Sequence, residues 1–178
     1  MKKLVFVPVA LLAIATFATA QMGHDKSKRP SPPASTECKF SDGKVVKIDY
    51  SSPRAKGRKI FGGLVPYGEV WRTGANEATT FVSDVTVNVG GKDVLAGSYT
   101  IFTVPEADKW TLIINKKTGE WGIPYKYESD ELARVPMSVS KMSAPVEDFT
   151  IAFEQAGSKC TLRMEWENTS AKVEMAEK

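Results

Sequence analysis

The chain has 178 residues, a length that suits one domain with a single hydrophobic core. Its 24 basic and 21 acidic residues give a formal net charge of +3, and the only basic cluster is the short run from Arg54 to Lys59. A nucleic-acid-binding protein needs a larger basic surface, so we predict no nucleic-acid partner.

The first 20 residues have the features of a secretory signal peptide. A basic start, Met1-Lys2-Lys3, precedes an apolar run that ends in Ala18-Thr19-Ala20. The alternative is an uncleaved membrane anchor, but the run is short for a span, which needs about 20 residues, and Pro8 interrupts it. Cleavage after Ala20 would leave 158 residues, with 22 basic and 21 acidic side chains. We therefore predict an exported protein, periplasmic or extracellular, with no membrane span after cleavage.

The rest of the chain divides by composition into three parts. Residues 21–36 are rich in proline, serine and basic residues, a composition that favours a disordered linker. Residues 37–170 are predicted to form a single β domain. Residues 171–178 are predicted to be a short polar C-terminal tail.

Short β-branched and aromatic segments, separated by glycine or proline turns, make up the domain. The first hairpin is predicted around Asp42-Gly43, a pair that supplies the positive dihedral angles of a tight turn. The later segments are residues 78–83, 85–89, 99–104, 110–115, 135–139, 149–153 and 160–166. The pattern predicts an all-β fold, an antiparallel β-sandwich or jelly-roll-like domain with at most one or two short helical turns. One such turn is expected near residues 129–133, with Ser129 as its N-cap.

The stretch from Ile60 to Asp84 stands apart from these segments. Its first half contains four glycines and a proline before Ala75, so a long regular element is not expected there. The same stretch carries Tyr67, Trp71 and Phe81, which is too much apolar surface for a solvated linker. We expect an irregular loop that is held by packing, a kind of segment that often carries function.

Two adjacent motifs in this stretch resemble those of a known family. They are Gly63-Leu64-Val65-Pro66-Tyr67-Gly68 and Trp71-Arg72-Thr73-Gly74-Ala75-Asn76-Glu77-Ala78-Thr79. The family is a bacterial exported domain of unknown function, number twenty-nine eleven in the unknown-function series. The resemblance covers roughly residues 51–167. It implies a β-rich exported domain and no settled activity.

The two cysteines, Cys38 and Cys160, fit an exported protein, in which disulfides persist. A bond between them would tie the first strand of the domain to a late strand and close almost the whole domain. The alternative is two separate buried thiols. We predict the disulfide.

Candidate ligand-binding residues gather in the irregular loop: Tyr67, Glu69, Trp71, Arg72, Asn76 and Glu77. Arg72 follows an aromatic residue that is expected to be buried, so its guanidinium should be partly desolvated and should need a planar acceptor such as a carboxylate. The functional interpretation makes Arg72 and Asn76 a polar anchor for an anionic or sugar-like ligand. The structural interpretation makes them an internal clamp, with Glu77 as a partner of Arg72 or of backbone amides.

Several residue types and motifs are absent from the predicted domain, and their absence excludes some kinds of site. The single histidine, His24, lies in the predicted linker, which excludes a Ser-His-Asp or Cys-His arrangement and a typical zinc site in the domain. No glycine-rich phosphate loop leads from a strand into a helix, so no nucleotide motif is present. We expect no catalytic residues, no metal and no cofactor.

The leading prediction is non-catalytic binding of a small polar or sugar-like ligand, a glycan or a surface partner through the region from Tyr67 to Glu77. One alternative is a carboxylate-based glycan hydrolase that uses Glu69 or Glu77. In that case four aromatic residues could stack on sugar rings: Trp71, Trp121, Tyr125 and Tyr127. Another is a purely structural envelope module. The oligomeric state stays open.

Overall fold

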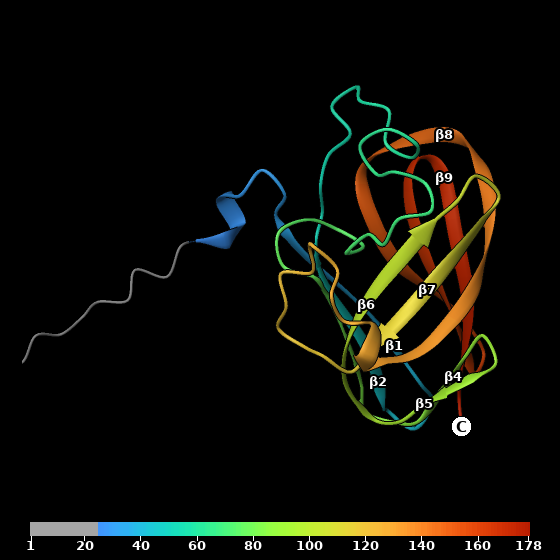
Figure 1. Ribbon diagram of the computed structural model, residues 1–178. Coiled ribbons are helices and arrows are strands. Elements are labelled where there is room, and N and C mark those ends of the chain that lie inside the picture. Colours follow the sequence, from blue (N-terminus) through green and yellow to red (C-terminus); the bar gives the residue numbers. More distant parts are fainter. Residues whose placement is uncertain (1–24) are drawn as a thin grey trace, which may run out of the picture.

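The computed structural model describes residues 25–178 (Figure 1). The predicted signal peptide and residues 21–24, with His24, lie outside the described residues. The elements are η1 (Lys26–Lys28), β1 (Pro33–Lys39), β2 (Val45–Ser51), β3 (Thr79–Ser83), β4 (Val87–Val89), β5 (Lys92–Val94), β6 (Gly97–Pro105), β7 (Lys109–Asn115), η2 (Glu128–Asp130), β8 (Glu131–Ala156) and β9 (Lys159–Glu177). Neither helical turn in this range has the length or apolar character that a bilayer-crossing helix requires.

The nine strands of the described part form one antiparallel sheet, in the order β1-β2-β3-β6-β7-β8-β9-β4-β5. This confirms the predicted all-β class. The first hairpin turns at Asp42-Gly43 as predicted, because Gly43 has a φ of 90° and donates its amide to the Phe40 carbonyl. The longest hairpin is β8–β9, in which the register shifts on either side of Val146.

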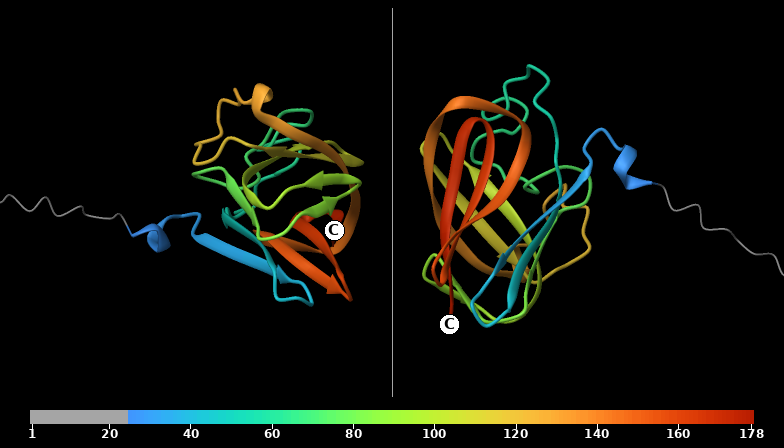
Figure 2. Two further views of the ribbon diagram at one scale, coloured as in Figure 1. Left: turned by 90° about the horizontal axis from the view of Figure 1, so that it is seen from below. Right: turned by 180° about the vertical axis from the view of Figure 1, so that it is seen from behind.

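The sheet curls on itself, so that its first strand comes close to its last long hairpin. The left view in Figure 2 shows the blue strand β1 close to the orange and red strands of the β8–β9 hairpin. Cys38 of β1 is bonded to Cys160 of β9, with 6.4 Å between their Cα atoms, so the predicted disulfide is confirmed. Gln155 at the end of β8 donates a 2.7 Å hydrogen bond to the Lys39 carbonyl. The two halves of the sheet thus enclose one core, as the layers of a sandwich do.

An aromatic cluster fills one end of this core. Trp71 and Trp166 are stacked, with ring centroids 5.9 Å apart, and Phe149 lies 4.8 Å from Trp71 in an edge-on contact. Phe61 makes a similar contact with Trp110 at 4.8 Å. Phe61 and Trp71 belong to the long connection between β2 and β3, so the cluster packs this irregular segment onto the sheet. Such pairs stabilise beyond the area they bury.

The structure differs from the predicted boundaries at both ends of the domain. Residues 33–36, predicted to be disordered, belong to β1, and each of them is paired with a residue of β2. Residues 171–177, predicted to be a polar tail, continue β9, and Ala171, Val173 and Met175 are buried. These three residues occupy every second position, which is the pattern of a strand. The charged residues between and after them made the segment look like a polar tail.

The predicted helical turn is also displaced. The structure has a 3-10 turn at Glu128–Asp130, and Tyr127 occupies the cap position without a side-chain capping bond. Ser129 therefore lies within the turn and is not its N-cap. The segment from Glu131 onward, which was expected to begin as helix, is strand β8. Pairing with β7 accounts for this, because strand pairing overrides a weak local helix signal.

Candidate functional site

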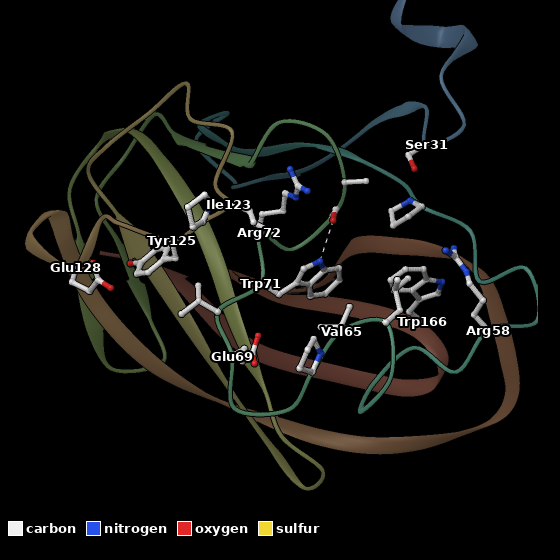
Figure 3. Close-up of a pocket in the computed structure, with 17 residues that line it drawn as sticks. Ser31, Arg58, Val65, Glu69, Trp71, Arg72, Ile123, Tyr125, Glu128 and Trp166 are labelled. Carbon is white, nitrogen blue, oxygen red and sulfur yellow. Dashed lines mark hydrogen bonds between the residues drawn. The ribbon is translucent and has the colours of Figure 1, made fainter.

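A pocket of about 720 Å³ opens between the β2–β3 connection and the loop that follows β7. Three of the six predicted ligand-binding residues, Glu69, Trp71 and Arg72, line it. Ile123 and Tyr125 line it from the second loop (Figure 3).

The buried wall of the pocket is aromatic. Trp71 and Trp166 are 7% and 1% exposed, and their stacked rings form this wall. The indole Nε1 of Trp71 donates a 3.1 Å hydrogen bond to the Gly74 carbonyl, drawn as the dashed line in Figure 3. The backbone of Trp71 pairs with Thr103 of β6 in both directions, at 2.7 and 2.9 Å. The wall is thus fixed by the sheet as well as by packing.

The turn after Trp71 uses unusual backbone conformations. Thr73 has a φ of 56° and Gly74 a φ of 151°. A Cβ atom on Gly74 would lie 2.9 Å from the Ser51 carbonyl oxygen, so only glycine fits there without movement. The Thr79 hydroxyl donates a 2.7 Å hydrogen bond to the Thr73 carbonyl. The threonine and glycine residues of the motif therefore have a structural explanation.

Arg72 makes its contacts with backbone carbonyls. Its Nη1 donates to the Asn76 carbonyl and, at 3.2 Å, to the Trp121 carbonyl. Its Cζ lies 5.1 Å from the centroid of the Trp121 ring, a cation–π arrangement. Among residues 25–178 no carboxylate forms an ion pair with Arg72, so the expected carboxylate partner is wrong. Burial lowers the pKa of Arg72 from its ordinary value.

Asn76 and Glu77 lie outside the pocket and hold the N-terminal segment. Asn76 has a φ of 58°, and its Nδ2 donates a 3.0 Å hydrogen bond to the Ser31 carbonyl. Glu77 pairs with Arg29 at 2.8 Å and with Lys26 at 3.1 Å. The hydrogen bond from its own backbone amide, together with those from Arg29 and Lys26, lowers the pKa of Glu77 to about 2.

The structural interpretation that paired Glu77 with Arg72 is therefore wrong. Asn76, which precedes Glu77, has a left-handed conformation, and Glu77 pairs with Arg29 and Lys26 of the N-terminal segment instead. That segment was predicted to be a disordered linker.

Tyr67 also lies outside the pocket. Its side chain is 46% exposed, and its ring covers Gly62, where an added Cβ atom would lie 2.6 Å from the Tyr67 ring. The structure therefore brings three of the six predicted residues together and assigns Tyr67, Asn76 and Glu77 to packing or tethering contacts.

The rim of the pocket carries charges of both signs. Arg58 and Arg72 are basic, and Glu69 and Glu128 are acidic. In the part of the chain that the structure describes, none of these four side chains takes part in an ion pair. Arg58 instead donates to the carbonyls of Ala55 at 2.9 Å and Arg54 at 2.6 Å.

Several pocket residues were not predicted from the sequence: Ser31, Arg58, Leu64, Ile123, Glu128 and Trp166. They come from segments far apart in the chain. Tyr125, which also lines the pocket, was predicted only as one of four aromatic residues that could stack on sugar rings. Its hydroxyl donates to Glu131 at 2.7 Å, and burial and this contact raise the pKa of Tyr125. No group of three His, Cys, Asp or Glu side chains within residues 25–178 has the arrangement of a metal site.

Fold and site together define a small all-β domain with an aromatic-walled pocket that is built by two irregular loops. The chain belongs to the family described as Protein of unknown function (DUF2911), whose model matches residues 31–175. This confirms the resemblance seen in the two adjacent motifs. No curated protein and no solved structure matches the chain.

Proposed function

We propose that this protein is an exported domain that binds a small, polar, sugar-like ligand in the pocket beside Trp71, without catalysing a reaction. The observation that carries the proposal is the four charged side chains that line one aromatic-walled pocket without pairing with another charge in the described chain. Three of them, Arg58, Glu69 and Glu128, are exposed, so they can hydrogen-bond a ligand without breaking an ion pair of the fold.

The size of the pocket supports this proposal. Pockets for small molecules have volumes of about 300 to 1,000 Å³. The volume of about 720 Å³ falls within this range. Apolar side chains such as Leu64 and Ile123, which are 49% and 47% exposed, flank the charged groups and offer contact area to a ligand.

The balance of charge favours a neutral ligand with many hydroxyl groups. A hydroxyl group donates to a carboxylate such as Glu69 and accepts from a guanidinium such as Arg58, so one ligand can satisfy both signs. An anion would be attracted by the arginines but repelled by Glu69 and Glu128, which line the same pocket. The apolar faces of a sugar ring would meet Ile123 and Tyr125.

Two observations support export. The disulfide between Cys38 and Cys160 is of the kind that persists in oxidising compartments. The basic start and apolar run of residues 1–20 are typical of a signal peptide.

The hydrolase alternative named Glu69 or Glu77 as the acting carboxylate, and the structure does not support Glu77 in that role. Glu77 lies outside the pocket and is paired with Arg29 and Lys26, so it is not placed to act on a ligand bound there. Glu69 remains in the pocket together with Glu128, and the experiment below separates binding from hydrolysis.

The test is calorimetric titration of the folded full chain with glucose, N-acetylglucosamine and their β-1,4-linked dimers. We expect saturable binding, and we expect Glu69→Gln to weaken it about tenfold or more, because a hydrogen bond to a charged group is worth about 1.5 to 3 kcal/mol. Glu37→Gln, on the exposed face of β1, is the matched control and should leave affinity unchanged. Absence of saturable binding would overturn the proposal. Release of monosaccharide from the dimers would replace it with the hydrolase alternative.

A further inference from the structure

Trp121 differs from the other tryptophans of the protein. The chain has four tryptophans, all within the described residues, and Trp71, Trp110 and Trp166 are buried. The side chain of Trp121 is 54% exposed. An exposed tryptophan leaves a large apolar surface in water, which needs an explanation when it lies beside a pocket.

The backbone around Trp121 is held in place. The Trp121 carbonyl accepts a hydrogen bond from Arg72 at 3.2 Å, and the Glu120 carbonyl accepts one from the Ala78 amide at 3.0 Å. Gly122 has a φ of 88°, and an added Cβ atom there would lie 3.1 Å from the Arg72 Cβ. The loop is therefore packed tightly against the Arg72 segment, and the indole ring projects from a fixed base.

One face of the indole ring is already occupied. The Arg72 guanidinium lies over it, with Cζ at 5.1 Å from the centroid. Trp121 as a whole is 54% exposed, so part of the residue remains available to a ligand. Because Arg72 lines the pocket as well as touching this ring, the ring and the pocket adjoin each other.

The loop that carries Trp121 also contributes residues to the pocket. Ile123 and Tyr125, which follow Trp121 in the same loop, line the pocket. Two residues of extended backbone span at most about 7 Å, so the Cα atom of Trp121 lies within that distance of the Cα atom of Ile123. Trp121 is therefore a near neighbour of the pocket-lining Ile123 in the same loop.

We propose that the exposed part of Trp121 is a second saccharide subsite next to the pocket, and that the ligand is an oligosaccharide of at least two sugar rings. This proposal rests on the proposed function and adds the ligand's length to it. Stacking on an aromatic ring suits the apolar face of a sugar, while the hydroxyl groups of the sugar suit the charged groups of the pocket rim. A flat apolar partner would instead bury the Glu69 carboxylate without a hydrogen-bond donor, at a cost in free energy.

The test compares β-1,4-linked N-acetylglucosamine oligomers of one to four units in calorimetric titrations of the full chain. Affinity should rise from the monomer to the oligomers, and Trp121→Ala should remove about tenfold or more of the oligomer affinity, as for truncation of an aromatic contact at a binding site. The same variant should leave monomer affinity within about twofold. Trp121→Phe should keep most of the oligomer affinity. Leu95→Ala, which removes another exposed apolar side chain, is the control and should change neither affinity.

The possible results separate this proposal from the proposed function. If Glu69→Gln weakens binding but Trp121→Ala leaves oligomer affinity unchanged, the second subsite is overturned and the pocket stands. If Trp121→Ala weakens the monomer and the oligomers equally, Trp121 supports the pocket and is not a subsite. If none of the sugars binds, both proposals are overturned.

Discussion

The β8–β9 hairpin and the connection between β2 and β3 are held by different forces. The hairpin strands, of 26 and 19 residues, are held by backbone ladders with buried side chains at alternate positions. The connection has no long strand, and it is held by aromatic contacts such as Phe61 with Trp110, by side-chain hydrogen bonds and by left-handed residues such as Asn76. Many sequences satisfy the first arrangement, because a ladder needs only backbone groups and an alternating pattern. Few satisfy the second, which depends on particular residues.

The family motif lies in the connection between β2 and β3, where the fold depends on particular residues. Gly74 is required by backbone conformation, and Trp71 both packs in the core and forms the pocket wall. Arg72 joins the connection to the loop that carries Trp121. The residues that build the pocket are thus also the residues that hold an irregular backbone in place.

The largest expected loss of stability follows from removing the disulfide that joins the two ends of the sheet. Replacing both Cys38 and Cys160 by alanine removes a cross-link between residues 122 positions apart. In the chain-entropy model, such a link stabilises the fold by about 4 to 5 kcal/mol. We expect the melting temperature to fall by about 10 °C or more, measured by circular dichroism. A midpoint that stays the same in the variant would show that the ladders alone hold the curled sheet.

Gly74→Ala tests whether the connection depends on particular residues. Gly74 has a φ of 151°, and an added Cβ atom would lie 2.9 Å from the Ser51 carbonyl oxygen. We expect the free energy of unfolding, measured in urea, to fall by about 2 to 3 kcal/mol. Gly57→Ala is the matched control: Gly57 also has a positive φ, of 68°, but nothing lies within 4 Å of an added Cβ atom. For Gly57→Ala, the loss in free energy of unfolding should be only about 1 kcal/mol. Equal losses at both positions would contradict the role assigned to close packing.

Arg72→Lys should have a smaller effect. Lysine keeps the charge but lacks the planar guanidinium that lies over the Trp121 ring while its Nη1 donates to the Asn76 and Trp121 carbonyls. Because no carboxylate of the described chain is left unpaired by the change, we expect a loss of about 1 to 2 kcal/mol in urea unfolding. A loss above about 3 kcal/mol would point to a buried charge partner that this structure does not show.

The smallest effect is the pH dependence of the Glu77 tether. Its pKa is lowered from an ordinary value of 4.5 to about 2, so its contribution to stability is present above about pH 4.5 and is lost as the pH falls toward 2. The Glu77 side chain is 42% exposed, so we expect this contribution to be less than about 1 kcal/mol. Melts of the wild type and Glu77→Gln should differ at pH 7 and converge near pH 2. A difference that stays constant across this window would show that ionisation of Glu77 is not what holds Arg29 and Lys26.

The all-β class, the first hairpin, the disulfide and the family could be predicted from the sequence, because each follows from residue type and short-range pattern. Alternation, turn pairs such as Asp42-Gly43 and a single pair of cysteines in a chain predicted to be exported can be read without knowing the fold. The C-terminal residues of β9 were missed because charged neighbours hid their alternation.

Which candidate residues share a pocket depends on the three-dimensional fold and could not be predicted from the sequence. Trp71 and Arg72 were predicted from their loop, but Trp166 of β9 and Tyr125 of a distant loop joined them only through curling of the sheet. Glu77 is five residues from Arg72, yet the left-handed turn at Asn76 and the cations of the N-terminal segment give it a different partner. Residue type and spacing constrain which contacts a side chain can make, but the path of the backbone selects among them, and that path is set by packing across the whole sheet.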